Sequence, residues 1–331
     1  MPAEWEPQDS VWFAWPTDKT LWPGNFSKIL DKFGKLITTV AQYTHVKLIC
    51  ADEHKKLALK ILKENGAKYH QVQLVDIPTN DVWCRDFGPI FVKNDNEELT
   101  IINWHFNAWG GKFDFELDNL VNDDIAGNEN CPIVNLDVIL EGGAIDVNGS
   151  GLLLTTEEVL LNNNRNPDMG KDDYEELFKK YLGIDKTIWL KNGIANDDTD
   201  GHIDNLARFI DDKTVMIASE ENQNSPNFLP LQENKNILYD FAKNYCPELA
   251  VIEVPLPDPT IHDGDQLPAS HLNFLITNEL ILVPIYNSST DKKVLNKFRK
   301  FFPTKTVQGF DCSDFLKEGG SIHCLSQQQP L

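Results

Sequence analysis

Short β-like runs alternate with helical stretches along all 331 residues of this chain, and no linker or low-complexity tract separates them. Apolar residues at three- and four-residue spacing, such as Ile29, Phe33, Ile37 and Val40, predict amphipathic helices. We expect helices over residues 26–43, 54–65, 171–181, 229–244 and 291–301. Runs rich in β-branched and aromatic residues predict strands over residues 11–15, 45–50, 71–77, 89–92, 100–104, 186–190, 214–218, 250–254, 271–277 and 280–284.

These elements predict an α/β fold with many β-hairpins rather than the strict βαβ order of a nucleotide-binding domain. Residues 144–147 and 152–156 flank Asn148-Gly149-Ser150-Gly151, a hairpin turn in which Asn and Gly tolerate positive φ. Neither Gly-x-Gly-x-x-Gly nor Gly-x-x-x-x-Gly-Lys-Ser/Thr occurs in the chain, so we expect no nucleotide phosphate site. We expect residues 1–331 to form a single catalytic domain.

Composition narrows the classes of partner. A formal net charge of −21 disfavours nucleic acid and anionic membrane, and it is compatible with either a small cationic substrate or simple solubility. No stretch approaches the roughly 18 apolar residues of a membrane span, and residues 1–7 lack the pattern of a secretory signal. Six cysteines are spread singly without a Cys-x-x-Cys pair, which favours a reducing, cytoplasmic setting over a disulfide framework. The sequence is also compatible with a homo-oligomer.

Five chemically suggestive positions recur at similar spacing. Intervals of 55, 61, 71 and 51 residues separate Asp86, Glu141, His202, Asn273 and Cys324. This spacing suggests units of about 60 residues that each deliver one side chain toward a common axis.

Cys324 is the candidate nucleophile, because it follows a glycine pair in a segment that has no other reason to be glycine-rich. Its neighbour His323 is a poor candidate base if the segment is a strand, since consecutive side chains then point to opposite faces. The base is therefore expected from elsewhere in the chain. Cys50, Cys131, Cys246 and Cys312 are interpreted as small buried apolar residues, and Cys84 as part of a wall.

His202 and Asp204 are the candidate acid/base and a candidate carboxylate. In an extended strand Asp200, His202 and Asp204 would share one face. A satisfied polar pair at a sheet edge is the structural alternative for these residues.

Asp86 and Glu141 are further candidate carboxylates. Asp86 lies beside Trp83, an arrangement suited to a planar cation through bidentate hydrogen bonds and cation–π contact. It could equally cap a turn before Gly88-Pro89. Glu141 enters an apolar segment and therefore needs a buried partner, for which an imidazole is a sensible candidate; a surface Glu before a turn is the alternative.

A zinc site would need ligands such as His202, Asp204, His323 and Cys324. None of them lies in a Cys-x-x-Cys, His-x-x-x-His or His-Glu-x-x-His arrangement, so we expect no metal.

The chain resembles the agmatine deiminases of the guanidine-modifying superfamily, which also holds peptidylarginine deiminases, arginine deiminases and amidinotransferases. The resemblance runs over nearly the whole chain. It is carried by Met1-Pro2-Ala3-Glu4-Trp5, Trp12-Phe13-Ala14-Trp15-Pro16, Trp83-Cys84-Arg85-Asp86-Phe87-Gly88-Pro89, Phe106-Asn107-Ala108-Trp109-Gly110-Gly111-Lys112, Leu140-Glu141-Gly142-Gly143, Thr155-Thr156-Glu157-Glu158, Asn164-Arg165-Asn166-Pro167, Asp198-Thr199-Asp200-Gly201-His202-Ile203-Asp204 and Ile322-His323-Cys324.

This resemblance implies a fold, an activity and a set of roles. The implied fold is a five-bladed, pseudo-symmetric α/β propeller of the pentein type with a central active site. The implied roles make Cys324 the nucleophile, His202 the acid/base and Glu141 the residue that orients His202, with Asp86 and Asp204 clamping the guanidinium. Trp83 would form the aromatic wall, and Asp198 is a candidate for the amine end of the substrate.

The chain departs from the family pattern at three positions. Members often carry a larger residue in place of Cys84, Tyr in place of His271, and three glycines where this chain has Gly319-Gly320. None of these departures touches a proposed catalytic group.

The reaction that the resemblance implies is hydrolysis of a C–N bond in a linear amidine through a covalent amidino-cysteine, with no cofactor. For agmatine, the products would be N-carbamoylputrescine and ammonia. A deiminase of free or peptidyl arginine, an amidinotransferase and a catalytically silent binding protein are the alternatives.

Overall fold

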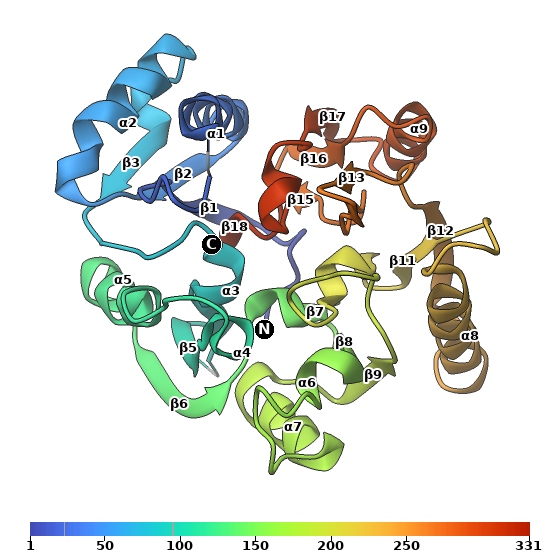
Figure 1. The fold of residues 1–331 in the computed structure, drawn as a ribbon. Helices are drawn as coiled ribbons and strands as arrows, with labels where there is room; N and C mark the ends of the chain where they lie inside the picture. The colour runs from blue at the N-terminus through green and yellow to red at the C-terminus, as the bar shows by residue number, and fades with distance from the viewer. Residues whose placement is uncertain (23, 95) are drawn as a thin grey trace.

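A computed structural model describes residues 1–22, 24–94 and 96–331 of the chain. The fold is mixed α/β, and Figure 1 shows its sheets lying around a common centre with the longer helices outside them. The longer helices are α1 (Phe26–Val40), α2 (Asp52–Glu64), α5 (Val121–Glu129), α7 (Lys171–Leu177), α8 (Phe228–Asn244) and α9 (Asp291–Phe301).

Five of the sheets share one pairing pattern. The strands of these sheets are, in hydrogen-bonded order, β18 (Ser326–Pro330), β1 (Gln8–Ala14), β2 (His45–Ile49) and β3 (Val72–Val75); β4 (Ile90–Lys93), β5 (Leu99–His105) and β6 (Ile133–Ile139); β7 (Asp146–Val147), β8 (Leu152–Thr156) and β9 (Lys186–Leu190); β10 (Ala207–Asp211), β11 (Thr214–Ser219) and β12 (Ala250–Pro255); β15 (Leu275–Ile276), β16 (Leu280–Ile285) and β17 (Thr306–Asp311). In each sheet the second strand pairs antiparallel with the first and parallel with the third.

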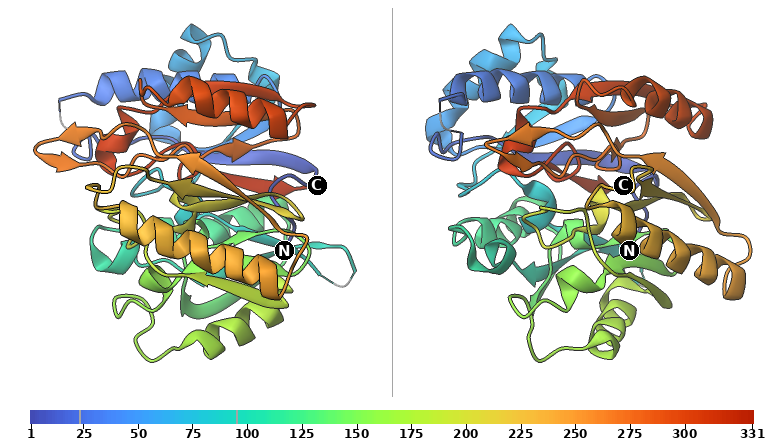
Figure 2. Two further views of the ribbon diagram at one scale, coloured as in Figure 1. Left: turned by 90° about the vertical axis from the view of Figure 1, so that its right-hand side faces the viewer. Right: turned by 45° about the vertical axis from the view of Figure 1, so that its right-hand side comes forward.

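The helices follow from these parallel pairs, because parallel neighbours need a crossover connection. Helix α1 connects β1 to β2, α8 connects β11 to β12, and α9 connects β16 to β17. Figure 2 shows helices on the outside of the sheets from two further directions. The apolar stripe predicted for the first helix is confirmed, since Ile29, Phe33, Ile37 and Val40 are all buried.

Short elements join the strands and the longer helices. They are the helices α3 (Cys84–Phe87), α4 (Ala108–Gly111) and α6 (Glu157–Leu160), and the 3-10 turns Tyr69–Gln71, Asp118–Leu120, Gly142–Ala144, Ile203–Asn205 and Phe315–Glu318. A small hairpin of β13 (Ile261–His262) and β14 (Asp265–Gln266) projects at the left of the left-hand view in Figure 2. Helix α3 contacts the turn Gly142–Ala144, which in turn contacts Ile203–Asn205, so three distant segments meet.

Most of the predicted elements are present within a few residues of their expected bounds. The hairpin at Asn148-Gly149-Ser150-Gly151 is confirmed by the antiparallel pair β7 and β8. The predicted strand over residues 271–277 is mostly wrong, because only Leu275–Ile276 pairs with β16. The predicted helix over residues 171–181 continues α7 into a π-helical turn, Phe178–Leu182.

Strand β18 was not predicted, because its sequence Ser-Gln-Gln-Gln-Pro has no apolar alternation. Its glutamines are nevertheless buried, and each has a hydrogen-bond partner. Gln327 Nε2 donates to Pro89 O at 2.7 Å, Gln328 Oε1 accepts from Arg85 at 2.6 Å, and Gln329 Oε1 accepts from Trp12 Nε1 at 2.9 Å. Strand β18 joins β1 and so places the two ends of the chain in one sheet.

Within the part of the chain that the structure describes, no helix is long and apolar enough to cross a membrane.

Candidate active site

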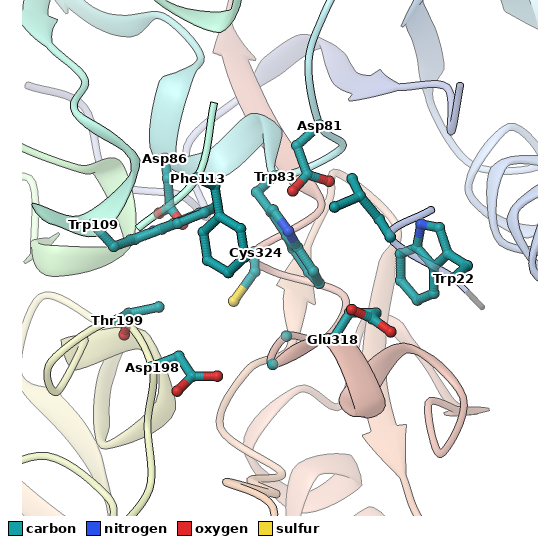
Figure 3. A pocket seen from close by; sticks show the side chains of 13 residues that line it. Trp22, Asp81, Trp83, Asp86, Trp109, Phe113, Asp198, Thr199, Glu318 and Cys324 are labelled. Carbon is teal, nitrogen blue, oxygen red and sulfur yellow. The ribbon is translucent and has the colours of Figure 1, made fainter. Parts of the chain in front are cut away.

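A cleft at the centre of the molecule gathers side chains from distant segments (Figure 3). Its walls are aromatic and come from Trp22, Trp83, Trp109 and Phe113. The charged side chains that line it are all acidic: Asp81, Asp86, Asp198 and Glu318. No Lys, Arg or His is present among the described residues of the lining, and Cys324 is the lining thiol. The cleft is therefore suited to an elongated cation.

Cys324 lies in a turn, Ile322–Leu325, rather than in a strand. Its side chain is buried, and Figure 3 shows its sulphur pointing into the cleft. Asn273 Nδ2 donates to Sγ at 3.0 Å, and Sγ lies 3.5 Å from Asp204 Oδ2. Burial, with the carboxylates of Asp204 and Asp86, raises the pKa of the Cys324 thiol well above its ordinary value. The cysteine is therefore a thiol in the free protein at neutral pH.

The expectation that His323 and Cys324 point to opposite faces is wrong, because it assumed a strand at this position. In the turn, both side chains meet one carboxylate: His323 Nδ1 lies 2.8 Å from Asp204 Oδ2, the same oxygen that Cys324 approaches. On its other side, His323 Nε2 lies 3.0 Å from Glu4 Oε2.

Asp86 lies on helix α3 at the inner end of the cleft. Its carboxylate accepts from Trp109 Nε1 at 3.1 Å and from Gly143 N at 3.0 Å, and Oδ1 lies 3.6 Å from His202 Nδ1. Burial and the charges of Asp204 and Glu141 raise the pKa of Asp86 well above its ordinary value. A cationic ligand would relieve this repulsion between carboxylates.

Trp83 lies directly before α3 and forms a wall of the cleft. Its ring packs against Gly320, where an added Cβ would lie 2.1 Å from Cζ3 of the indole. Gly320, four residues before Cys324, is therefore required for the close approach of the Trp83 ring.

His202 and Asp204 were expected to share a face of an extended strand, and that premise is wrong. His202 precedes the 3-10 turn Ile203–Asn205, which contains Asp204, while Asp200 turns outward to Lys112 and Arg165 at 3.0 and 2.7 Å. His202 and Asp204 are both fully buried. Burial lowers the pKa of His202 to about 3, so the imidazole is neutral in the free protein.

The ring of His202 is closely surrounded. An added Cβ at Gly143 would lie 2.5 Å from His202 Nδ1 and 2.7 Å from Asp86 Oδ1. Neither ring nitrogen has a hydrogen-bond partner among the described residues, and the same holds for Asp204 Oδ1. Buried polar groups without partners are rare in folded proteins, and their gathering around Cys324 leaves them free to bind a ligand.

Glu141 needed a buried partner, and the structure identifies that partner as Arg165 rather than an imidazole. Arg165 Nε donates to Glu141 Oε1 at 2.6 Å, and both side chains are fully buried. Burial raises the pKa of Glu141 despite the opposing effect of Arg165. The other oxygen, Oε2, has no partner within the described residues and forms no hydrogen bond to His202.

Asp198 lies at the outer part of the cleft, where it is exposed. Figure 3 shows its carboxylate across the cleft from Glu318. Burial and the nearby Asp81 raise the pKa of Glu318 to about 7, and burial raises the pKa of Asp81 to about 6. The outer part of the cleft therefore holds three carboxylates that a bound cation would stabilise.

Several contact residues were given no role by the sequence. Asn273, noted only for its spacing, contacts the thiol, and its Oδ1 accepts from the backbone of His323 at 2.9 Å. Trp109 and Arg165 lie inside segments that carried the family resemblance, which was a usable signal. Glu318 directly precedes Gly319-Gly320, the pair at which the chain departs from the three glycines that the family often has.

Among residues 1–22, 24–94 and 96–331, no group of three or more His, Cys, Asp or Glu side chains is placed to hold a metal ion.

Comparison with known proteins gives one consistent result. A family model described as Porphyromonas-type peptidyl-arginine deiminase matches residues 1–330. The agmatine deiminase of Stutzerimonas stutzeri strain A1501 is 34% identical over 355 residues, which cover 100% of this chain and 95% of that protein. The solved agmatine deiminase of Enterococcus faecalis has a TM-score of 0.93 at 31% identity, covering 100% of this chain and 95% of that one. The agmatine deiminase of C. jejuni, solved as a cysteine-to-serine variant with substrate bound, has a TM-score of 0.91 at 33% identity, covering 99% and 95%.

Proposed function

The chain belongs to the Porphyromonas-type peptidyl-arginine deiminase family, and from this premise we propose that it is an agmatine deiminase. It hydrolyses a C–N bond of agmatine to give N-carbamoylputrescine and ammonia. The observation that carries the proposal is the cleft, which has a thiol at its inner end and only acidic charged side chains along its lining. Agmatine has a guanidinium at one end and an ammonium at the other, so both ends match this charge pattern.

The inner end of the cleft binds the guanidinium. Asp86 and Asp204 clamp its nitrogens, and the ring of Trp83 lies along it. Two observations support this assignment: Asp204 Oδ1 has no partner among the described residues, and Asp86, whose pKa is raised, lacks a countercharge that the substrate supplies. Two carboxylates on one guanidinium hold its plane and keep its central carbon close to Cys324 Sγ.

The first half of the reaction begins with a thiol and a neutral imidazole. The bound cation favours the thiolate, and His202 takes the thiol proton. Cys324 Sγ then bonds to the guanidinium carbon, and His202 returns the proton to a departing NH2 group. The C–N bond breaks, ammonia leaves, and an amidino-cysteine remains.

The second half consumes one water. Neutral His202 takes one proton from the water, whose oxygen bonds to the amidino carbon, and the C–S bond breaks. The proton on His202 returns to Cys324, the second proton of the water passes to solvent and balances the released ammonia as ammonium, and the ureido product leaves. Glu141 is proposed to orient His202 during the reaction; in the free protein Arg165 holds its Oε1, and its Oε2 forms no hydrogen bond to His202 or to any other described residue.

The outer end of the cleft selects an amine over an α-carboxylate. Asp198, with Glu318 and Asp81, receives the ammonium of agmatine. Arginine would bring its carboxylate against these acids without a cation to pair it, and like charges in a partly desolvated site are strongly disfavoured.

We propose that the five sheets that share one pairing pattern are the blades of a five-bladed pseudo-symmetric propeller, which forms a single catalytic domain over residues 1–331 with the active site on its axis. The pairing of β18 with β1, which places both ends of the chain in one sheet, supports this proposal. The six cysteines are all free, which supports a cytoplasmic setting.

The test is ammonia release from agmatine, arginine and a blocked arginine peptide in parallel. We expect turnover of agmatine alone, abolished in Cys324→Ala and retained in Cys131→Ala, whose half-buried thiol contacts Leu99 O at 3.2 Å. Faster turnover of arginine or of the peptide would support the proposed deimination chemistry and contradict agmatine as the substrate. Failure on all three, with transfer of the amidino group to an added amine, would indicate an amidinotransferase.

A further inference from the structure

Glu4 lies in the N-terminal segment, far from the cleft in sequence, yet its buried carboxylate joins three other segments. Oε1 accepts from the backbone N of Ile276 at 2.7 Å. Oε2 accepts from Arg208 and lies 3.0 Å from His323 Nε2. Nothing in the proposed reaction uses this carboxylate, although it contacts the residue directly before the nucleophile.

His323 is held between two carboxylates. Its Nδ1 lies 2.8 Å from Asp204 Oδ2 and its Nε2 lies 3.0 Å from Glu4 Oε2, both within hydrogen-bond range. A neutral imidazole carries one N–H and can donate to only one of them, whereas an imidazolium donates to both. The geometry therefore favours a ring that carries two protons.

The local charges agree with this state. Glu4, Asp146 and Asp204 are three buried carboxylates, and Arg208 and Arg85 are two buried cations around them. The second proton of His323 supplies the third positive charge. Other titratable groups also act on the cluster: Lys305 on Glu4, and Asp86, Asp197, His202 and Cys324 on Asp204.

The two carboxylates proposed to clamp the guanidinium, Asp204 and Asp86, differ in the direction of their pKa shifts. This difference is expected if His323 carries a positive charge beside Asp204 alone. Asp204 has the His323 contact, and although burial alone would raise its pKa, the hydrogen bond and charge of His323 hold it below its ordinary value. Asp86 has no such cation, and burial beside Asp204 and Glu141 raises its pKa. His323 also occupies Asp204 Oδ2 and leaves Oδ1 without a partner among the described residues.

We propose that Glu4 is a positioning residue for the deiminase site, which keeps His323 doubly protonated and thereby holds Asp204 ionised with one oxygen free for the substrate guanidinium. Glu4 in the N-terminal segment thus acts on the site through its contact with His323 and the contact of His323 with Asp204. The expected effect on KM rests on the proposed function, whereas the expected protonation of His323 rests only on its two carboxylate contacts.

The first test is independent of activity. The ring ¹⁵N signals of His323 in the wild-type protein, assigned by their loss in His323→Asn, are expected to show an N–H on both ring nitrogens in the ligand-free protein. A ring with a single N–H overturns the proposal whatever the enzyme's substrate proves to be.

The second test compares Glu4→Gln with Asp146→Asn. Both variants remove a carboxylate that pairs with buried Arg208, whose Nε lies 2.5 Å from Asp146 Oδ2, but Asp146 does not contact His323. In Glu4→Gln, the carboxylate that faces His323 Nε2 is lost, and the ring is expected to keep a single N–H. The KM for agmatine should then rise on the order of 10-fold with a smaller change in kcat.

Asp146→Asn is expected to lower the midpoint of thermal unfolding like Glu4→Gln, while keeping the wild-type KM and both N–H signals of His323. Glu4→Asp, which retains the charge, should restore part of the loss. If the two carboxamide variants share one KM and one His323 ¹⁵N spectrum and differ from the wild type only in stability, Glu4 is merely structural and the proposal is overturned. If Glu4→Gln does not fold, the ¹⁵N measurement on the wild type decides the question alone.

Discussion

Cys324 and His202 illustrate at the scale of single residues how burial sets the resting state of the site. Burial favours the neutral form of each group, so it raises the pKa of the thiol and lowers that of the imidazole to about 3. A thiolate–imidazolium pair is therefore disfavoured until a cation enters. This arrangement protects the nucleophile from side reactions, because the thiolate is the reactive form.

We predict that iodoacetamide, a neutral reagent, alkylates Cys324 slowly at about pH 7 and faster as the pH rises beyond about 9, because the thiolate fraction increases. Mass spectrometry of the tryptic peptides after timed exposure measures this rate. Cys131, which is only half-buried, is the internal reference. Rapid alkylation of Cys324 at neutral pH would contradict a resting thiol.

The raised pKa of Glu318 leads to a second prediction at the scale of single residues. Its pKa is raised to about 7, so the carboxylate is ionised only above that pH and is progressively neutralised as the pH falls through it. Binding of a substrate ammonium needs the ionised form, and KM for agmatine should therefore rise severalfold between about pH 8 and pH 6.

Glu318→Gln should have a higher KM at pH 8 and a flatter KM against pH in this range, with kcat little changed. Glu248→Gln, which removes an exposed carboxylate paired with Lys213, should leave KM and its pH dependence unchanged. An unchanged KM in Glu318→Gln would indicate that the substrate ammonium binds elsewhere, to Asp198 or Asp81.

At the scale of elements, the glycine turn Gly142–Ala144 decides how closely α3 and the segment around His202 approach. Gly143 donates its N–H to Asp86 Oδ1, and a Cβ at this position would meet both Asp86 and His202. The turn thus sets the distance between an expected clamp and the expected acid/base.

Gly143→Ala is predicted to fold but to lower kcat/KM at least 10-fold, because a displacement of even about 1 Å at a reacting group is costly. Steady-state kinetics and a thermal melt measure the two effects. Gly127→Ala is the matched control, since no atom lies within 4 Å of a Cβ there and the residue lies inside helix α5. It should keep full activity and gain up to about 1 kcal/mol of stability from helix propensity.

Element prediction succeeded where the local pattern was strong and failed where pairing partners were distant. The stripe of α1 and the Asn148-Gly149-Ser150-Gly151 hairpin depend on backbone periodicity and turn chemistry, which are local. The strand expected over residues 271–277 is apolar but mostly turns, because it supplies Asn273 to the thiol. The segment that contains Cys324 is likewise a turn, although the sequence analysis considered a strand there.

At the scale of the whole molecule, β18 joins the end of the chain to its beginning. Deletion of residues 326–331 removes this pairing and leaves the buried Arg85 without its contact to Gln328. A buried charge that loses its partner costs several kcal/mol. We predict that the truncated protein loses its cooperative thermal transition or unfolds at a much lower temperature, as measured by calorimetry.

Deletion of Leu331 alone is the control for this truncation. That residue is 72% exposed and contributes one backbone hydrogen bond, to Pro7 O. The change should be within about 0.5 kcal/mol. Equal stability of the longer truncation would contradict a structural role for the β1–β18 pairing.

The sequence by itself determined the α/β class, most helices, the family and four of the residues that line the cleft, Trp83, Asp86, Asp198 and Cys324, because each is written in local periodicity or in short motifs. Tertiary structure alone decided that Glu141 pairs with Arg165, that His323 lies between Asp204 and Glu4, and that a run of glutamines forms a buried strand. The physical reason is the range of the interactions. A helix stripe or a turn is set by neighbours along the backbone, whereas the partner of a buried charge is set by whichever distant segment the sheets bring within hydrogen-bond reach.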